Sequence, residues 1–279
     1  MIMKNVLGTS ALAACLAVSG AATGEERPLW EIGVGAAALS FPAYRGSDQT
    51  NNFLMPVPHF TYNGDFFKAD RQGIRGSLFD SDRVDLTVSL ALSPPAPSDD
   101  IKVRAGMPDL EATFEIGPQL DLTFWRSENR ARFVKLLLPL RAAVTLEGSP
   151  QSIGWVFHPK LNMDITDLPG LPGWNLGMLA GPLWGDKRQH AYYYGVAPRH
   201  ATGWRPAYEA DSGYAGMQYL VALSKRFPKY WVGSFVRYDN LSGATFENSP
   251  LVRQKDYFAA GIAVTWVLGE SSTRVQVND

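Results

Sequence analysis

The sequence predicts an all-β protein whose strands form a closed antiparallel transmembrane β-barrel. Three observations lead to this fold class. Residues 110–125 alternate between apolar and polar side chains over a longer stretch than the roughly 3–10 residues of ordinary strands. Much of the remaining chain repeats this alternation, which is typical of barrels with one lipid-facing and one wet face. Beyond the N-terminus there is no apolar run of about 18 residues, so membrane-spanning helices are not expected.

The segment 110–125 has two distinct faces. Its even positions carry Leu110, Ala112, Phe114, Ile116, Pro118, Leu120, Leu122 and Phe124. Its odd positions carry Glu111, Thr113, Glu115, Gly117, Gln119, Asp121 and Thr123. A strand separates these two sets, whereas a helix would mix them and Pro118 would break it.

Composition agrees with a single barrel domain. Of the 279 residues, 46% are hydrophobic and 19% are charged. The mean hydropathy of −0.12 is too polar for a bundle of membrane helices, but barrels escape hydropathy scales because only alternate residues are apolar. A formal net charge of −1 argues against a nucleic-acid partner.

Residues 1–24 are predicted to be a secretory signal peptide. Lys4 begins a short positive region, residues 6–18 are apolar, and small residues follow, so cleavage is expected between Ala21 and Gly24. The only cysteine, Cys15, ends a Leu-Ala-Ala-Cys sequence that resembles a lipobox. It is either a lipidation site or a cysteine within the apolar signal core. Residues 25–279 are then one outer-membrane barrel domain with a polar tail at 269–279.

Alternation and turn residues predict the strands in order. They are 30–41, 53–62, 66–79, 84–92, 110–125, 132–146, 152–164, 174–185, 214–227, 230–241 and 254–268. Bacterial barrels have even strand numbers, so we predict twelve strands, with 66–79 forming two short ones, and keep ten as the alternative. The long loops 42–52, 93–108, 186–213 and 242–253 then fall on one side. Tryptophan and tyrosine near strand ends favour a membrane barrel over a soluble sandwich or lipocalin-like barrel. These aromatic residues are Trp30, Tyr62, Trp125, Trp174, Trp184, Tyr230, Trp231 and Trp266.

Charged residues on the polar strand faces form a candidate interior ladder. They are Glu111, Glu115, Asp121, Lys135, Arg141, Lys160 and Asp164. Neighbouring antiparallel strands bring such side chains within reach of one another. The ladder either fills and closes a narrow barrel with ion pairs or lines a selective aqueous pore.

The longest predicted loop carries a candidate aromatic surface. It contains Tyr192, Tyr193, Tyr194, Trp204 and Tyr208. These residues either form an exposed binding surface or belong to a loop that folds back to cap the barrel.

No catalytic, metal or cofactor site is expected. The histidines His59, His158, His190 and His200 lack metal-ligand spacing on one element. A rim hydrolase could pair His59 or His158 with Ser89 or Ser152, but no nucleophile elbow or orienting third residue marks such a site.

Several motifs resemble the MipA/OmpV family of Gram-negative outer-membrane proteins. They are Phe41-Pro42-Ala43-Tyr44-Arg45-Gly46-Ser47-Asp48, Pro56-Val57-Pro58, Tyr62-Asn63-Gly64-Asp65, Tyr193-Tyr194-Gly195-Val196, Tyr208 to Gly213, and Leu241-Ser242-Gly243-Ala244 leading to Asn248-Ser249-Pro250-Leu251-Val252. Within the first motif, residues 42–47 are expected to shape a turn, with Gly46 supplying permissive backbone angles.

The resemblance implies a closed outer-membrane barrel without enzymatic activity. It implies a scaffold that links a lytic murein transglycosylase, MltA, to a penicillin-binding protein, with outer-membrane lipid as the surrounding partner. A porin-like channel, and a surface antigen or adhesin acting through the long loops, are the alternative functions.

Overall fold

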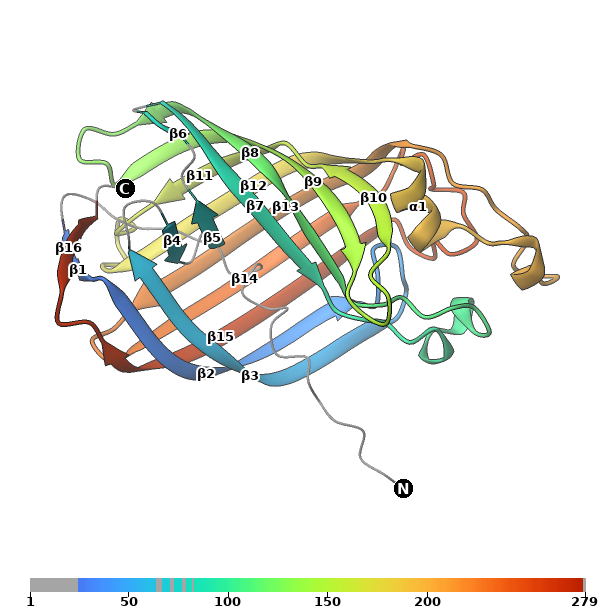
Figure 1. Ribbon diagram of the computed structural model, residues 1–279, viewed down its shortest axis with the longest axis horizontal. Coiled ribbons are helices and arrows are strands. Elements are labelled where there is room, and N and C mark those ends of the chain that lie inside the picture. The colour runs from blue at the N-terminus through green and yellow to red at the C-terminus, as the bar shows by residue number, and fades with distance from the viewer. Residues whose placement is uncertain (1–24, 64–66, 71–72, 77–78, 82, 278–279) are drawn as a thin grey trace, which may run out of the picture.

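The structure is a computed structural model that describes residues 25–63, 67–70, 73–76, 79–81 and 83–277. The predicted signal peptide and Cys15 lie outside the described residues. The fold is all-β, as expected, with one large antiparallel sheet and a separate two-stranded sheet (Figure 1). Within the described residues, no helix is long and apolar enough to span a membrane.

Ten segments of the large sheet match the predicted strands closely. They are β2 (Trp30–Pro42), β3 (Thr50–Asn63), β7 (Val84–Ser93), β8 (Thr113–Arg126), β9 (Arg132–Thr145), β10 (Ser152–Phe157) with β11 (Lys160–Ile165), β12 (Trp174–Gly185), β13 (Gly213–Arg226), β14 (Tyr230–Asn240) and β15 (Asp256–Glu270). The predicted strand 152–164 is divided, because His158 and Pro159 interrupt it. Both halves still pair with β9 and β12.

The sheet curls so that its first and last long strands are neighbours. Sequence neighbours pair throughout, and β15 also pairs with β2, with Val264 opposite Ala36. The segment 66–79 does form the two short strands β4 (Phe67–Asp70) and β5 (Gly73–Gly76), followed by β6 (Phe79–Asp80). β5 lies beside β7. Counting β4 and β5 as one strand or two gives eleven or twelve strands, which agrees with the higher of the two predicted counts.

Apolar side chains point outward from the long strands, as their alternation predicts. Val221 and Val236, for example, face each other on β13 and β14 and are each about half exposed. Exposed aromatic residues lie near both ends of the strands. They are Phe124, Trp125 and Trp266 toward the short turns, and Trp155, Trp184 and Phe258 toward the long loops.

Three predicted orientations are wrong. Ile153 is buried instead of facing outward, because a bulge between Ser152 and Gly154 reverses the alternation there. Trp231 is buried against Gly233 instead of belonging to an interfacial girdle. Leu110 precedes β8 instead of beginning it. It forms an isolated bridge with Ala96 and is buried beneath the loops.

The two ends of the sheet differ. One end has short turns and carries a second sheet, in which β1 (Glu25–Pro28) pairs with β16 (Arg274–Val277). The predicted polar tail therefore contains a strand that the sequence pattern did not reveal. The other end carries the long connections, which hold α1 (Lys187–Tyr194) and three short 3₁₀ turns: η1 (Ser98–Asp100), η2 (Lys102–Arg104) and η3 (Pro198–His200) (Figure 1).

Candidate functional site

The long loops pack together into one buried cluster, which we call the loop cap. Its buried side chains are Tyr44, Ala96, Ile101, Val103, Leu110, Leu183, Tyr194, Val196, Ala210, Ala215, Leu241, Ala244, Phe246, Leu251 and Tyr257. Phe246, Leu241 and Leu251 are completely buried. Loops that share a core of this kind hold one conformation, because exposing that core to water is unfavourable.

Helix α1 holds most of the predicted aromatic surface. Asp186 caps the helix by accepting a hydrogen bond from the Gln189 amide at 2.8 Å. Tyr194 is 4% exposed and stacks on Phe246, with ring centroids 3.6 Å apart. Ser249 donates to the Tyr194 carbonyl at 2.7 Å. The helix thus belongs to the loop cap.

The five aromatic residues therefore do not form one exposed surface. Tyr193 lies close to the Thr113 hydroxyl, and the Tyr192 hydroxyl accepts a hydrogen bond from the Glu111 amide at 2.8 Å. Tyr208 is partly buried and donates to the Thr245 carbonyl at 3.3 Å. Only Trp204 is well exposed, at 60%. This arrangement favours the capping alternative.

Two buried arginines hold the loops of the cap to one another. Arg205 is 2% exposed and donates to the carbonyls of Val103 at 2.8 Å and His200 at 2.8 Å. Arg104 is 3% exposed and donates to the Tyr193 carbonyl at 3.1 Å. Each guanidinium satisfies backbone carbonyls that loops would otherwise leave unpaired.

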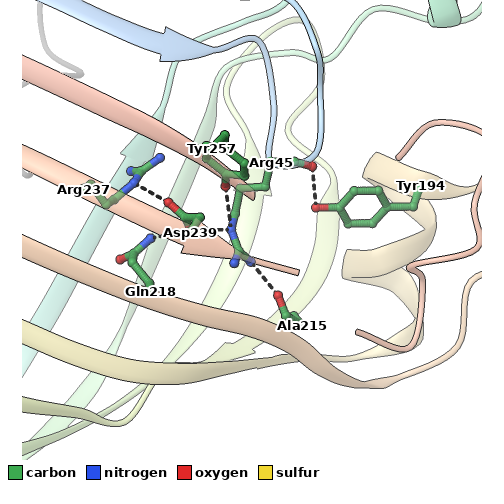
Figure 2. Close-up of polar contacts among 7 residues, drawn as sticks. All are labelled: Arg45, Tyr194, Ala215, Gln218, Arg237, Asp239 and Tyr257. Carbon is green, nitrogen blue, oxygen red and sulfur yellow. Dashed lines mark hydrogen bonds and ion pairs between the residues drawn. The ribbon is translucent and has the colours of Figure 1, made fainter. Parts of the chain in front are cut away.

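Beneath the cap, Asp239 on β14 is the centre of a polar network (Figure 2). Its carboxylate is fully buried and accepts from Arg45 at 3.0 Å, Arg237 at 2.7 Å and Gln218 at 3.1 Å. Arg45 also contacts the Tyr257 hydroxyl and donates to the Ala215 carbonyl at 2.9 Å.

Arg45 lies in the loop between β2 and β3, and this loop forms the turn that the sequence predicts. The Ser47 amide donates to the Tyr44 carbonyl at 3.0 Å, and Gly46 has a φ of +94°, which favours glycine. Burial lowers the pKa of Arg45, but Tyr257 and Asp239 outweigh this effect, so the pKa is raised and the guanidinium stays charged. Burial also raises the pKa of Tyr194 well above its usual range, so its neutral hydroxyl donates to the Arg45 carbonyl at 3.0 Å.

Six of the seven predicted ladder residues lie on strands, and the exception is Glu111, which precedes β8. Arg141 pairs with Glu115 on the adjacent strand at 2.8 Å. Lys135 pairs with Asp85, two strands away, at 3.5 Å. Asp121, Arg141 and Asp164 are each less than 7% exposed, although all three are charged. Asp121 accepts from Gln119 and Asp164 accepts from Asn162, both at 2.7 Å, and Lys160 also has interaction partners.

The opposite wall of the interior is largely apolar, which the ladder alone did not predict. Ala37, Leu39, Val57, Ala222, Trp231, Phe235 and Ala263 form a second buried cluster on β2, β3 and β13–β15. Toward the short turns, this wall ends in a polar group in which Glu31 accepts from Arg226 at 2.8 Å and lies 3.4 Å from His59. The interior is therefore occupied by side chains along much of its length.

A cavity of about 250 Å³ remains directly beneath the loop cap. Its lining includes Arg45, Arg141 and Arg237, the carboxylates of Glu111 and Glu115, and apolar side chains such as Leu39, Phe235 and Phe246. This cavity joins the ladder, the polar network and α1. It is the place in the described structure where charged groups from several elements converge on an open volume, which makes it the candidate functional site.

Sequence reasoning missed Arg45, Arg237 and Asp239 as site residues. Arg237 and Asp239 are two apart on one strand, so a polar pair on one face was a readable signal. The joining of Arg45 to Asp239 spans 194 positions and no local pattern reveals it. Among the described residues, no cluster of three or more potential metal ligands occurs. His59 is held by Glu31 and Thr265, and Ser89 accepts from Arg141, so neither is set in a hydrolytic arrangement.

Comparisons with known proteins agree with the resemblance. Three solved structures are similar in fold. The NanC porin matches with 8% identity and a TM-score of 0.38, over 85% of this chain and 100% of that chain. An active-site mutant of outer membrane phospholipase A from Escherichia coli has 12% identity and a TM-score of 0.33, with coverage of 92% and 97%. The Pseudomonas putida toluene transporter TodX has 9% identity and a TM-score of 0.29, with coverage of 91% and 69%.

A search of curated proteins finds no match. The profile of the family described as MltA-interacting protein MipA, however, matches residues 34–268, from β2 to the end of β15. Because this match covers most of the sequence, the chain belongs to the MipA family.

Proposed function

We propose that this protein is a closed outer-membrane β-barrel that acts as a non-enzymatic adaptor for peptidoglycan-remodelling enzymes. Membership of a family described by its interaction with MltA carries this proposal. The partner would be a lytic murein transglycosylase, together with a penicillin-binding protein. Lateral contact between β5 and β7 would complete the barrel.

The chemistry of the two faces supports a membrane location. The outward side chains of the strands form an apolar band flanked by aromatic residues, while charged residues face inward. A lipid-embedded barrel requires this arrangement, because hydrocarbon accepts apolar side chains and excludes charged ones. In bacterial barrels the short turns face the periplasm, so the β1–β16 sheet would lie on that side.

The filled interior supports an adaptor in preference to an open pore. Ion pairs cross the interior at Glu115–Arg141 and Asp85–Lys135, and the loop cap covers one end. A barrel blocked in this way serves as a rigid anchor in the membrane. The transglycosylase would then dock on the short-turn end, where the β1–β16 sheet offers hydrogen-bonding edges.

A pull-down with the folded full chain in detergent tests the adaptor role. A purified MltA-type transglycosylase should co-elute with the folded barrel and not with heat-unfolded chain. Removing residues 274–279, which include β16, should abolish co-elution while the barrel remains folded by circular dichroism. A matched variant with Trp204→Ala, at the opposite end, should retain the partner. Failure of the wild-type barrel to bind either enzyme would overturn the proposal.

A gated channel is the second candidate, because the cavity beneath the cap is lined with arginine and glutamate. Planar-bilayer recordings distinguish the two functions. The adaptor proposal expects no steady conductance of porin size from wild-type protein. Reproducible unitary conductance that changes when Arg141 is replaced by Gln would favour the channel instead.

A further inference from the structure

The cavity beneath the loop cap has the size and chemistry of a small-molecule site. Its volume of about 250 Å³ equals about eight water molecules at about 30 Å³ each. Ligand sites typically combine apolar walls with a few convergent polar groups. Here the apolar part is formed by Leu39, Phe41, Phe235 and Phe246, among others.

One wall offers a cationic hydrogen-bond donor with spare capacity. The Nε and Nη1 atoms of Arg45 are engaged by Asp239, Tyr257 and the Ala215 carbonyl. Its Nη2 atom is buried and has no hydrogen-bond partner among the described residues. A guanidinium nitrogen only donates, so an anionic oxygen such as a carboxylate would satisfy it best.

Other cavity-lining residues offer unpaired acceptors. The Oε2 atom of Glu111 is buried and unpartnered within the described part of the chain. The backbone of Glu111 is fixed by its amide bond to the Tyr192 hydroxyl. The Nδ1 atom of His190 lies 2.6 Å from the Asp211 carbonyl and must carry the proton, so its buried and unpartnered Nε2 is an acceptor. These groups call for donors on a ligand.

We propose that this cavity binds a small zwitterion with an apolar side chain, a hydrophobic amino acid or dipeptide. The ligand carboxylate would meet Arg45, the ammonium would meet Glu111, and the side chain would lie against Phe235 and Phe246. Leaving a buried charge or polar atom unpaired is unfavourable, so a ligand that pairs both ends gains affinity from both. This proposal is independent of the adaptor role, since the cavity lies at the capped end.

Isothermal titration calorimetry of the folded full chain in detergent tests the proposal, with L-alanyl-L-leucine as the probe. Saturable one-to-one binding is expected. The N-acetylated peptide and the C-terminal amide each lose one charge, and each should bind at least tenfold more weakly. Glu111→Gln should also bind the free peptide at least tenfold more weakly. Glu128→Gln makes the same chemical change at an exposed turn on the opposite end and should leave the affinity unchanged.

Arg45→Lys keeps the positive charge but removes the unpaired nitrogen, and it should weaken peptide binding and abolish the difference between free peptide and amide. If this variant fails to fold, Glu111→Gln and the blocked peptides still decide. Absence of saturable binding by wild-type protein would mean that the cavity holds water alone. Equal affinity for free and blocked peptides, or for Glu111→Gln and Glu128→Gln, would also overturn the assignment.

Discussion

Asp239 draws three distant parts of the chain to one carboxylate. Gln218 reaches it from β13, Arg237 from β14 and Arg45 from the loop after β2. Ionised carboxylates accept hydrogen bonds from several donors at once, which makes them effective junctions when they are buried. Asp239 therefore couples the loop cap to the strands below it.

Replacing Asp239 by Asn should destabilise the protein by about 3–5 kcal/mol, because it leaves buried guanidinium groups without their carboxylate. Reversible urea unfolding of the folded barrel in detergent measures this change. Asp256→Asn is the matched control. Its carboxylate lies on the outside at 2.6 Å from the Tyr238 hydroxyl, so its loss should cost no more than about 1.5 kcal/mol. Equal effects of both substitutions would show that Asp239 is not a junction.

At the scale of elements, the strands could be predicted and the loop cap could not. Strand positions follow from a two-residue period that any segment carries in itself, as in β8 and β9. Local irregularities such as the bulge before Gly154 and the break at Pro159 shift side chains that periodicity places on the other face. Helix α1 was missed, although Asp186 followed by Gln189 is a helix-start signal. The cap depends on contacts between loops far apart in sequence, which no periodic pattern records.

Helix α1 should loosen at acidic pH through His190. Burial lowers the pKa of His190 below its ordinary value of 6.5, although its bond to the Asp211 carbonyl opposes this. The opened cap then binds more protons than the folded cap, so cap stability is complete above pH 6.5 and falls as the pH drops toward the lowered pKa. Hydrogen exchange of the α1 amides, corrected for intrinsic rates, should quicken between pH 7.5 and 5.

His190→Gln retains a donor for the Asp211 carbonyl but does not titrate, so it is the control for this pH response. Its corrected exchange in α1 should be independent of pH over the same range. A pH response of equal size in His190→Gln would assign the effect to another group.

At the scale of the whole molecule, the outer surface is apolar and the inner surface carries the charges. Exposed side chains such as Val221 and Ile262 would be unfavourable in water over so large an area, and they suit a hydrocarbon environment. The all-β class and the membrane pattern were readable from sequence because both depend on alternation alone. The apolar interior wall was not, because inward Trp231 and Phe235 fill space left by glycine and alanine on neighbouring strands.

A charge on the outer surface should therefore be costly in a way that depends on depth. Val221→Arg, at the middle of β13, should reduce the free energy of unfolding by about 2–4 kcal/mol for protein refolded into phospholipid vesicles. Leu268→Arg, near the end of β15, should cost only about 0–1 kcal/mol because it lies near the proposed interface. Denaturant titrations in vesicles measure both. A larger penalty at Leu268 than at Val221 would contradict the proposed membrane position.

The pairing of β2 with β15 also limits how the molecule can be made. Ala36 and Val264 face each other although more than 200 residues separate them. Such non-local pairing folds slowly, because the entropy of closing the loop is lost before the contacts form. A nascent chain cannot seal its seam until the last long strand has been synthesised, so the half-built sheet has an open edge that needs protection from aggregation. Assembly of this protein should accordingly be post-translational and dependent on chaperones.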